Sequence, residues 1–366
     1  MSDPRVTRLA QVLVQHSLGL GSGDQFALLT NPPAEELSRA VYREALLAGA
    51  HVFVVNGLPG EDEILLKHAS DAQLDHVPPV MRLVVEQYDA LLMIGAPQNT
   101  RELSGVDPVR LSRARKAKAE VMKTLRERCA RGEMRRCITI YPTNALAQEA
   151  DMSLSEYEDF VYGAGLLDLP DPVAAWQEEG KRQRELIRWL AGKDEVVLQG
   201  KDVDLRLSIQ GRSFIEASGH VNFPDGEIYT SPVEDSANGW VRFAYPGIYA
   251  GQEVVDIELW FEQGRVVKEQ ARKGQDLLMT LLHMDDGSRY LGELGIGTNY
   301  GIQRFTKNML FDEKIGGTIH LALGAGFPEA GCRNESGIHW DMLCDMTEGE
   351  IRVDGELFYK DGQFAL

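Results

Sequence analysis

The pattern of apolar residues changes character near residue 195, and this change constrains the fold more than any other feature of the chain. Before that point, short apolar runs of strand length alternate with segments of helical spacing. Such alternation predicts parallel βαβ units. The expected strands cover residues 25–29, 52–55, 88–94 and 137–141, and the expected helices cover residues 5–17, 34–48, 65–73, 110–131, 155–166 and 171–190.

Beyond residue 195, short β-like runs are separated by Gly, Asp and Asn turns. We therefore predict an α/β domain with a mostly parallel sheet over residues 1–194, and a β-rich α+β domain over residues 195–366 that carries the metal site. A length of 366 residues fits two domains, since domains usually contain roughly 100–200 residues. The first domain is expected to act as a scaffold or to mediate dimerisation.

The first domain lacks the glycine-rich loops of nucleotide-binding folds. GLGSGD, which starts at Gly19, precedes the first expected strand instead of following it, and no G-x-x-x-x-G-K-[ST] phosphate loop occurs in the sequence. The net charge is −18, from 56 acidic and 38 basic residues. Because such a surface repels polyanions, no nucleic-acid partner is expected.

The N-terminal segment and the cysteines of the chain favour a cytoplasmic location. The first 20 residues carry early charges, which is not the pattern of a signal peptide. No run of about 18 apolar residues occurs, so no membrane partner is expected. The four cysteines contain no C-x-x-C pair, and free thiols are expected of Cys129, Cys137, Cys332 and Cys344.

Acidic and histidine residues that could bind a metal collect in glycine- and proline-rich segments of the second domain. NFPDGEIYTSP places Glu227 at the start of a strand, directly after a Pro-Asp-Gly turn. YLGELGIG places Glu293 in an apolar run, and FDEKIGGTIHLALG contains Glu313 and His320. Taken singly, Glu227 fits a surface carboxylate beside a hairpin better and His320 fits a core histidine better, whereas Glu293 fits a structural and a functional role equally well.

The fourth segment, NESGIHWDM, spaces His339 and Asp341 two residues apart. On a strand, these two side chains share one face while Trp340 points to the opposite one. Carboxylates and imidazoles together suit zinc, cobalt or manganese. Because a carboxylate-rich set can hold two ions about 3.5–4 Å apart, we expect two divalent ions per chain.

Four of these stretches resemble, in the same order, the aminopeptidase T family of thermophilic metallo-aminopeptidases: NFPDGEIYTSP, LGELGIG, LFDEKIGGTIHLALG and ESGIHWDM. The likeness covers the second half of the chain and extends more loosely over the first. It implies an α/β domain followed by a β-rich domain, homodimers, and removal of N-terminal residues from peptide substrates. It also implies that Glu293 is the bridging ligand and the catalytic residue, and that the metal ligands are Glu227, Glu293, His320, His339 and Asp341, with Glu313 as a further ligand or support.

One position departs from the family. The family usually carries a tyrosine seven residues after the histidine at position 320, where this chain has Phe327. If that hydroxyl stabilises a tetrahedral oxyanion, its loss costs about 10²–10³ in rate. Tyr290 and Tyr300 are candidate replacements, and the preferred N-terminal residue of the substrate stays open.

Two other functions fit the same residues. His320, His339 and Asp341 form a two-histidine, one-carboxylate set that could hold a single Fe(II) in a ring-cleaving dioxygenase on a related fold. Such a site needs neither Glu227 nor Glu293, and both are present. A metal-binding relative without catalytic activity is the second alternative, and Phe327 is its support.

Overall fold

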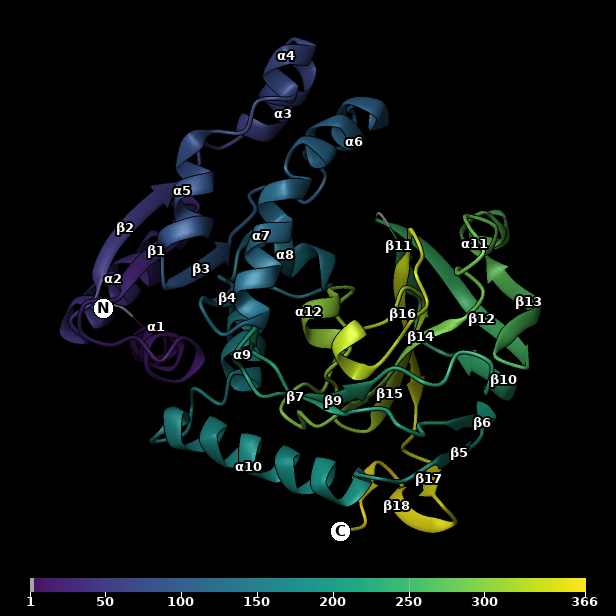
Figure 1. Cartoon of the computed structure of the whole chain (residues 1–366). Helices are drawn as coiled ribbons and strands as arrows, with labels where there is room; N and C mark the ends of the chain where they lie inside the picture. The colour runs from purple at the N-terminus through teal and green to yellow at the C-terminus, as the bar shows by residue number, and fades with distance from the viewer. Residues whose placement is uncertain (1–2, 250) are drawn as a thin grey trace. The chain divides into compact units, whose positions relative to one another are not determined.

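The computed structural model describes residues 3–249 and 251–366, and the chain forms two compact units, which are described separately (Figure 1). Unit 1 contains Met1–Trp176 with Gly219–Pro224, and unit 2 contains Gln177–Ser218 with Asp225–Leu366. The predicted boundary between residues 194 and 195 falls between helix α10 (Pro172–Leu190) and strand β5 (Glu195–Gln199). This domain division stays a prediction.

Unit 1 is built on a parallel sheet whose described strands follow the order β2-β1-β3-β4-β8. The central strands β1 and β3 are largely buried, whereas β2 forms an edge and is mostly exposed. The alternation of apolar runs and helical spacing therefore predicted the parallel βαβ arrangement correctly. The strands are β1 (Gln25–Thr30), β2 (His51–Asn56), β3 (Ala90–Gly95), β4 (Arg135–Ile140) and β8 (Asn222–Phe223).

The helices of unit 1 mostly begin where the sequence supplies a capping side chain. Asp3 accepts from the Arg5 backbone N–H at the start of α1, and Ser153 forms a capping box with Glu156 at the start of α9. The single helix predicted over residues 110–131 is wrong, because the chain turns at Lys118 between an α6 without buried residues and a packed α7. The helices are α1 (Pro4–Val12), α2 (Glu35–Leu47), α3 (Glu61–His68), α4 (Asp71–Leu74), α5 (Pro79–Gln87), α6 (Pro108–Ala117), α7 (Ala119–Ala130), α8 (Asn144–Glu149) and α9 (Leu154–Ala164).

Unit 2 contains two antiparallel sheets. In the larger one the described strands follow the order β11-β12-β10-β6-β5-β17-β18-β19, and β13 pairs with β12. The smaller sheet has the order β16-β15-β14-β9-β7. The strands after β5 are β6 (Val203–Ser208), β7 (Ile215–Ala217), β9 (Glu227–Thr230), β10 (Asn238–Phe243), β11 (Gly247–Tyr249), β12 (Gln252–Glu262), β13 (Arg265–Lys273), β14 (Leu291–Gly297), β15 (Thr318–Gly324), β16 (His339–Asp345), β17 (Glu350–Val353), β18 (Glu356–Lys360) and β19 (Gln363–Phe364), and the helices are α11 (Gln275–Leu282) and α12 (Met309–Asp312).

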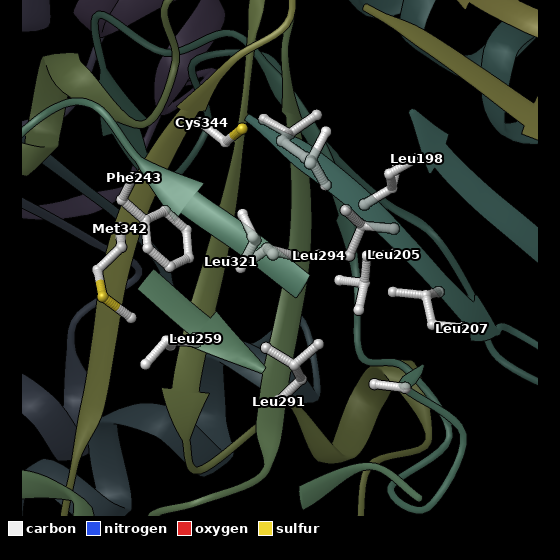
Figure 2. Packing of buried hydrophobic residues seen from close by; sticks show 14 of the residues in the cluster. Leu198, Leu205, Leu207, Phe243, Leu259, Leu291, Leu294, Leu321, Met342 and Cys344 are labelled. Carbon is white, nitrogen blue, oxygen red and sulfur yellow. The ribbon is translucent and has the colours of Figure 1, made fainter. Parts of the chain in front are cut away.

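One apolar core joins the two sheets of unit 2 (Figure 2). Leu205 and Leu259 of the larger sheet belong to the same buried cluster as Leu294 and Leu321 of the smaller sheet. Because side chains alternate along a strand, the residues next to Leu294 on β14 and next to Leu321 on β15 point to the other face of the smaller sheet. That other face carries the polar side chains of the site.

A β-bulge in β14 decides which of its side chains reach that other face. Leu291 pairs with Leu323 and Glu293 pairs with Ala322, so Gly292 is an extra residue on β14. In a regular strand, Leu291 and Glu293 would share one face. The bulge re-aims the strand, so Leu291 joins the core while Glu293 points away from it.

No helix among the described residues is both long and apolar enough to cross a membrane.

Candidate metal centre

The five predicted metal ligands lie together on the face of the smaller sheet opposite the core. Glu227 is the first residue of β9, and Glu293 follows the bulge in β14. His320 lies in the middle of β15, and β16 begins with His339. Glu293 and Asp341 both pair with Ala322, one from each side of β15, so the short alanine side chain leaves space between the two carboxylates.

Glu293 belongs to two groups of side chains that could each hold a metal ion. One group is Glu227, Glu293 and His320, and the other is Glu293, His339 and Asp341. The ligand atoms of each group lie within 4.8 Å of one another. Oε1 of Glu293 is 3.2 Å from Nε2 of His320, and Oε2 is 3.1 Å from Nε2 of His339. The two oxygens of one carboxylate therefore face two different imidazoles.

Several oxygens of the site are placed for a cation. Oε2 of Glu227 is 3.2 Å from Nε2 of His320, and Oδ1 of Asp341 is 3.4 Å from Nε2 of His339. Within the described residues, both oxygens are buried without a hydrogen-bond donor. Buried carboxylates need such a partner or a metal. The residues therefore fit divalent metal ions.

The ring of His339 is held by a backbone carbonyl. Its Nδ1 lies 2.7 Å from the carbonyl oxygen of Ala325, so Nδ1–H donates and Nε2 is left to face Glu293 and Asp341. Histidines that bind metals usually donate their other ring N–H in this way, which fixes the tautomer and the ring orientation. This contact supports a ligand role for Nε2 of His339.

The glycines of the LGELGIG segment make room for His320. Gly295 pairs with His320 across β14 and β15, and a Cβ at Gly295 would lie 2.0 Å from the imidazole ring. No other residue type fits beneath the ring without a shift of the ring or the backbone. The glycine therefore allows the imidazole to lie flat over β14 and reach the glutamates.

The electrostatics of the site depend on burial and on mutual pairing. Burial alone would raise the pKa of Glu293, but hydrogen bonds from His320 and His339 lower it to about 2. Burial would lower the pKa of both histidines, but the facing carboxylates raise it to about 10 for His320 and about 11 for His339. For Glu227, burial dominates and raises the pKa to about 8. In the metal-free protein the two imidazoles therefore hold protons.

Lys314 is a residue of the site that the sequence did not single out. Its side chain is fully buried, with Nζ 3.4 Å from Oε1 of Glu227 and 3.8 Å from Oδ1 of Asp225, and it also contacts Glu313. Glu313 lies against Lys314 and outside both ligand groups, so its role as a ligand stays a prediction. A lysine directly after Glu313, inside an apolar and glycine-rich run, was the available signal.

Phe327 packs against the site. Its ring centroid is 5.3 Å from that of His339 and 4.8 Å from that of Tyr229. The hydroxyl of Tyr300 donates to the carbonyl of Gly362 at 3.0 Å, so this proposed replacement is engaged elsewhere. Tyr229, which the sequence did not single out, shares the face of Glu227, and burial together with Glu227 and Glu293 raises its pKa.

Comparison with known proteins assigns the family. The model of the thermophilic metalloprotease family (M29) matches residues 2–364. The chain belongs to this family. The M29 assignment confirms the predicted resemblance and, with it, the enzyme class of a metal-dependent peptidase.

Curated relatives of this M29 protein align over nearly their whole length. It is 27% identical to Aminopeptidase 2 of Geobacillus stearothermophilus, over 99% of this chain and 95% of the relative. It is 26% identical to Aminopeptidase T of Thermus thermophilus, over 97% and 95%. The solved structure of wild-type AmpT from Thermus thermophilus superposes with a TM-score of 0.86 at 22% identity, covering 99% of both chains. This match confirms the predicted fold class.

Proposed function

We propose that this M29 protein is an aminopeptidase that uses two divalent cations bridged by Glu293. The observation that carries the proposal is the position of Glu293, whose two oxygens face His320 and His339 at 3.2 and 3.1 Å. Each of these two imidazoles belongs to a separate group of three potential ligands that includes Glu293. A carboxylate shared in this way is the arrangement expected of a dinuclear hydrolase.

The formal charge of the site also supports two ions. The carboxylates that converge there outnumber the one ammonium group, that of Lys314, by four; they are Asp225, Glu227, Glu293, Glu313 and Asp341. With both imidazoles neutral as ligands, two divalent cations balance the remaining negative charge. A single Fe(II), as in the dioxygenase alternative, would balance half of it and leave buried carboxylates uncompensated.

The residues of this chain have distinct tasks in peptide hydrolysis. Bound divalent cations would supply Lewis acidity and lower the pKa of a water molecule. Glu293 has both oxygens turned to imidazoles, so we propose that it contributes by holding the centre together and not by carrying a proton. Asp341 and His339 lie at the more accessible side, where the His339 side chain is 33% exposed. A peptide would therefore enter from the side of β16.

The substrate is proposed from chemistry and from the relatives. Both relatives described above are named aminopeptidases. A free amino terminus can bind one of the ions or pair with a carboxylate of the site, and an acylated terminus cannot, which favours an exopeptidase over an endopeptidase. Phe327 places an apolar ring beside His339, where the family's usual tyrosine would place a hydroxyl. We therefore expect turnover with a rate lowered by the lack of that donor.

The decisive assay starts from metal-free protein. Amine release is followed from aminoacyl-p-nitroanilides, dipeptides and their N-acetylated counterparts after addition of Co(II), Zn(II) or Mn(II). The proposal predicts turnover that requires both a metal and a free amino terminus. Oxygen uptake with Fe(II) and a hydroxylated aromatic ring would instead establish the dioxygenase. Metal binding without turnover on any substrate would support the non-catalytic relative.

We also propose that the protein forms a homodimer through unit 1. Strand β2 lies at the sheet edge, and Phe53, Val54 and Val55 on it are exposed. Exposed apolar edge strands usually pair or are covered. Light scattering should give the mass of a dimer for the wild type and that of a monomer for Val54→Glu. A monomeric wild type would refute the dimer.

The cytoplasmic location stays a prediction.

A further inference from the structure

Lys314 is the most unusual charged residue of unit 2. Its side chain has 0% exposure, and lysine is almost never fully buried unless it is paired. It follows the short helix α12 and precedes β15, the strand of His320. Burial favours the neutral amine, but Glu227, Glu313 and Asp225 outweigh burial and raise the pKa of Lys314. A charged ammonium is therefore held directly behind the candidate metal ligands.

The two oxygens of Glu227 have different neighbours, the ammonium of Lys314 and the imidazole of His320. Oε1 of Glu227 lies 3.4 Å from Nζ of Lys314, whereas Oε2 lies 3.2 Å from Nε2 of His320. Oε2 is buried and lacks a hydrogen-bond donor among the described residues. Lys314 also lies 3.8 Å from Asp225, which belongs to the same turn that leads into β9. The lysine thus fixes both the carboxylate and the turn that carries it.

We propose that Lys314 is a positioning residue that makes Glu227 a one-oxygen ligand, with Oε1 held by the ammonium and Oε2 directed at the ion shared with Glu293 and His320. The inference rests on the proposed dinuclear site and deepens it, because it assigns Lys314 to one of the two ions. Among the described residues, the second group, Glu293, His339 and Asp341, makes no ion pair with Lys314. Loss of Lys314 should therefore affect the two ions unequally.

Charge and position predict opposite results for the variant Lys314→Met. If the ammonium acted only through its charge, its removal would strengthen the binding of cations nearby. If it positions Glu227, its removal frees the carboxylate to turn away, and the ion of the Glu227 group binds more weakly. Loss of a residue that orients a ligand typically weakens metal binding by about 10–100-fold.

The experiment compares wild type, Lys314→Met and the control Lys181→Met, whose lysine is 63% exposed and pairs with Glu178 on the surface. Metal-free proteins are titrated with Co(II), and the visible absorption of bound cobalt and the metal content after gel filtration are measured. We expect two ions in the wild type and in Lys181→Met. In Lys314→Met, we expect one ion to bind with unchanged affinity and the other about 10–100-fold more weakly.

If circular dichroism shows that Lys314→Met does not fold, a second variant tests the same role. Lys314→Arg keeps the positive charge but replaces a compact ammonium with a planar guanidinium of different reach. Positioning predicts weaker binding of one ion in this variant as well. Two ions bound as tightly as in the wild type, or more tightly, in either variant would overturn the role of Lys314. A wild type that binds a single ion would instead refute the dinuclear proposal itself.

Discussion

The two faces of strand β15 are equally buried, but one packs into the apolar core and the other faces the charged side chains of the site. All seven residues of Thr318–Gly324 are buried. Ile319, Leu321 and Leu323 belong to the apolar core, whereas His320 points to the carboxylates of Glu227 and Glu293. Burial on the core face stabilises the fold because it removes apolar surface from water. Burial on the other face removes water from charged groups, which strengthens their interactions and makes a cation necessary.

The largest expected effect is on the charged face. Glu293→Ala removes the carboxylate shared by both ligand groups. We expect both ions to be lost and peptidase activity to fall by more than about 10²-fold, beyond the usual cost of residues that only orient a ligand. Metal content and kcat/KM measured on the same sample check this. Full turnover with two bound ions would show that Glu293 is not the bridge.

The core face should respond in stability and not in metal binding. Leu321 is fully buried in the core shared by the two sheets. Leu321→Ala should lower the free energy of unfolding by about 2–5 kcal/mol because it leaves a cavity. Chemical denaturation of the metal-free protein measures the loss. The folded variant should still bind two ions, and a selective loss of one ion would show that the two faces are not independent.

A substitution beneath His320 should affect both stability and metal binding. Gly295→Ala places a Cβ 2.0 Å from the imidazole ring, and such overpacking costs about 1–3 kcal/mol. Displacement of the ring should weaken the ion of the Glu227 group and spare the His339 group. Gly163, whose Cβ would meet no atom within 4 Å, provides the control Gly163→Ala. Equal metal affinity in Gly295→Ala and the wild type would contradict the placement of His320.

The smallest expected effect is the proton release that accompanies metal binding. In the metal-free protein, the pKa of His320 is raised to about 10 and that of His339 to about 11 by the facing carboxylates. Since an imidazole must lose its proton to bind a metal, affinity should increase from pH 7 towards pH 10. Without metal, these raised pKa values stabilise the fold below the unfolded value of about 6.5, and this stabilisation is lost as the pH rises through 10 and 11. Calorimetry in buffers of different ionisation enthalpy should detect proton release at pH 7, and heats independent of buffer would contradict it.

The sequence predicted the features of the fold and of the site that depend on local spacing. The two-residue spacing of His339 and Asp341 alone places both side chains on one face, and Trp340 lies in the core as expected. The four segments that resemble a known family predicted which acids gather with them. The alternation of strands and helices likewise predicted the parallel sheet of unit 1.

Features that depend on long-range packing escaped the sequence. Leu291 and Glu293 lie on opposite faces because an extra residue in β14, Gly292, resets the alternation, and no local pattern marks that bulge. Asp225 lies in a Pro-Asp-Gly turn that reads as a surface turn, yet it is 1% exposed. Lys314 pairs with Asp225 and Glu227 from a distant part of the chain. Only the folded sheet brings these charges together.

Anomalous X-ray scattering from crystals of the zinc-loaded protein would show whether Glu293 lies between two ions. We expect two zinc peaks about 3.5–4 Å apart, with one oxygen of Glu293 directed at each and His320 and His339 on different ions. A single peak coordinated by His320, His339 and Asp341, with neither Glu227 nor Glu293 bound to it, would contradict the dinuclear site.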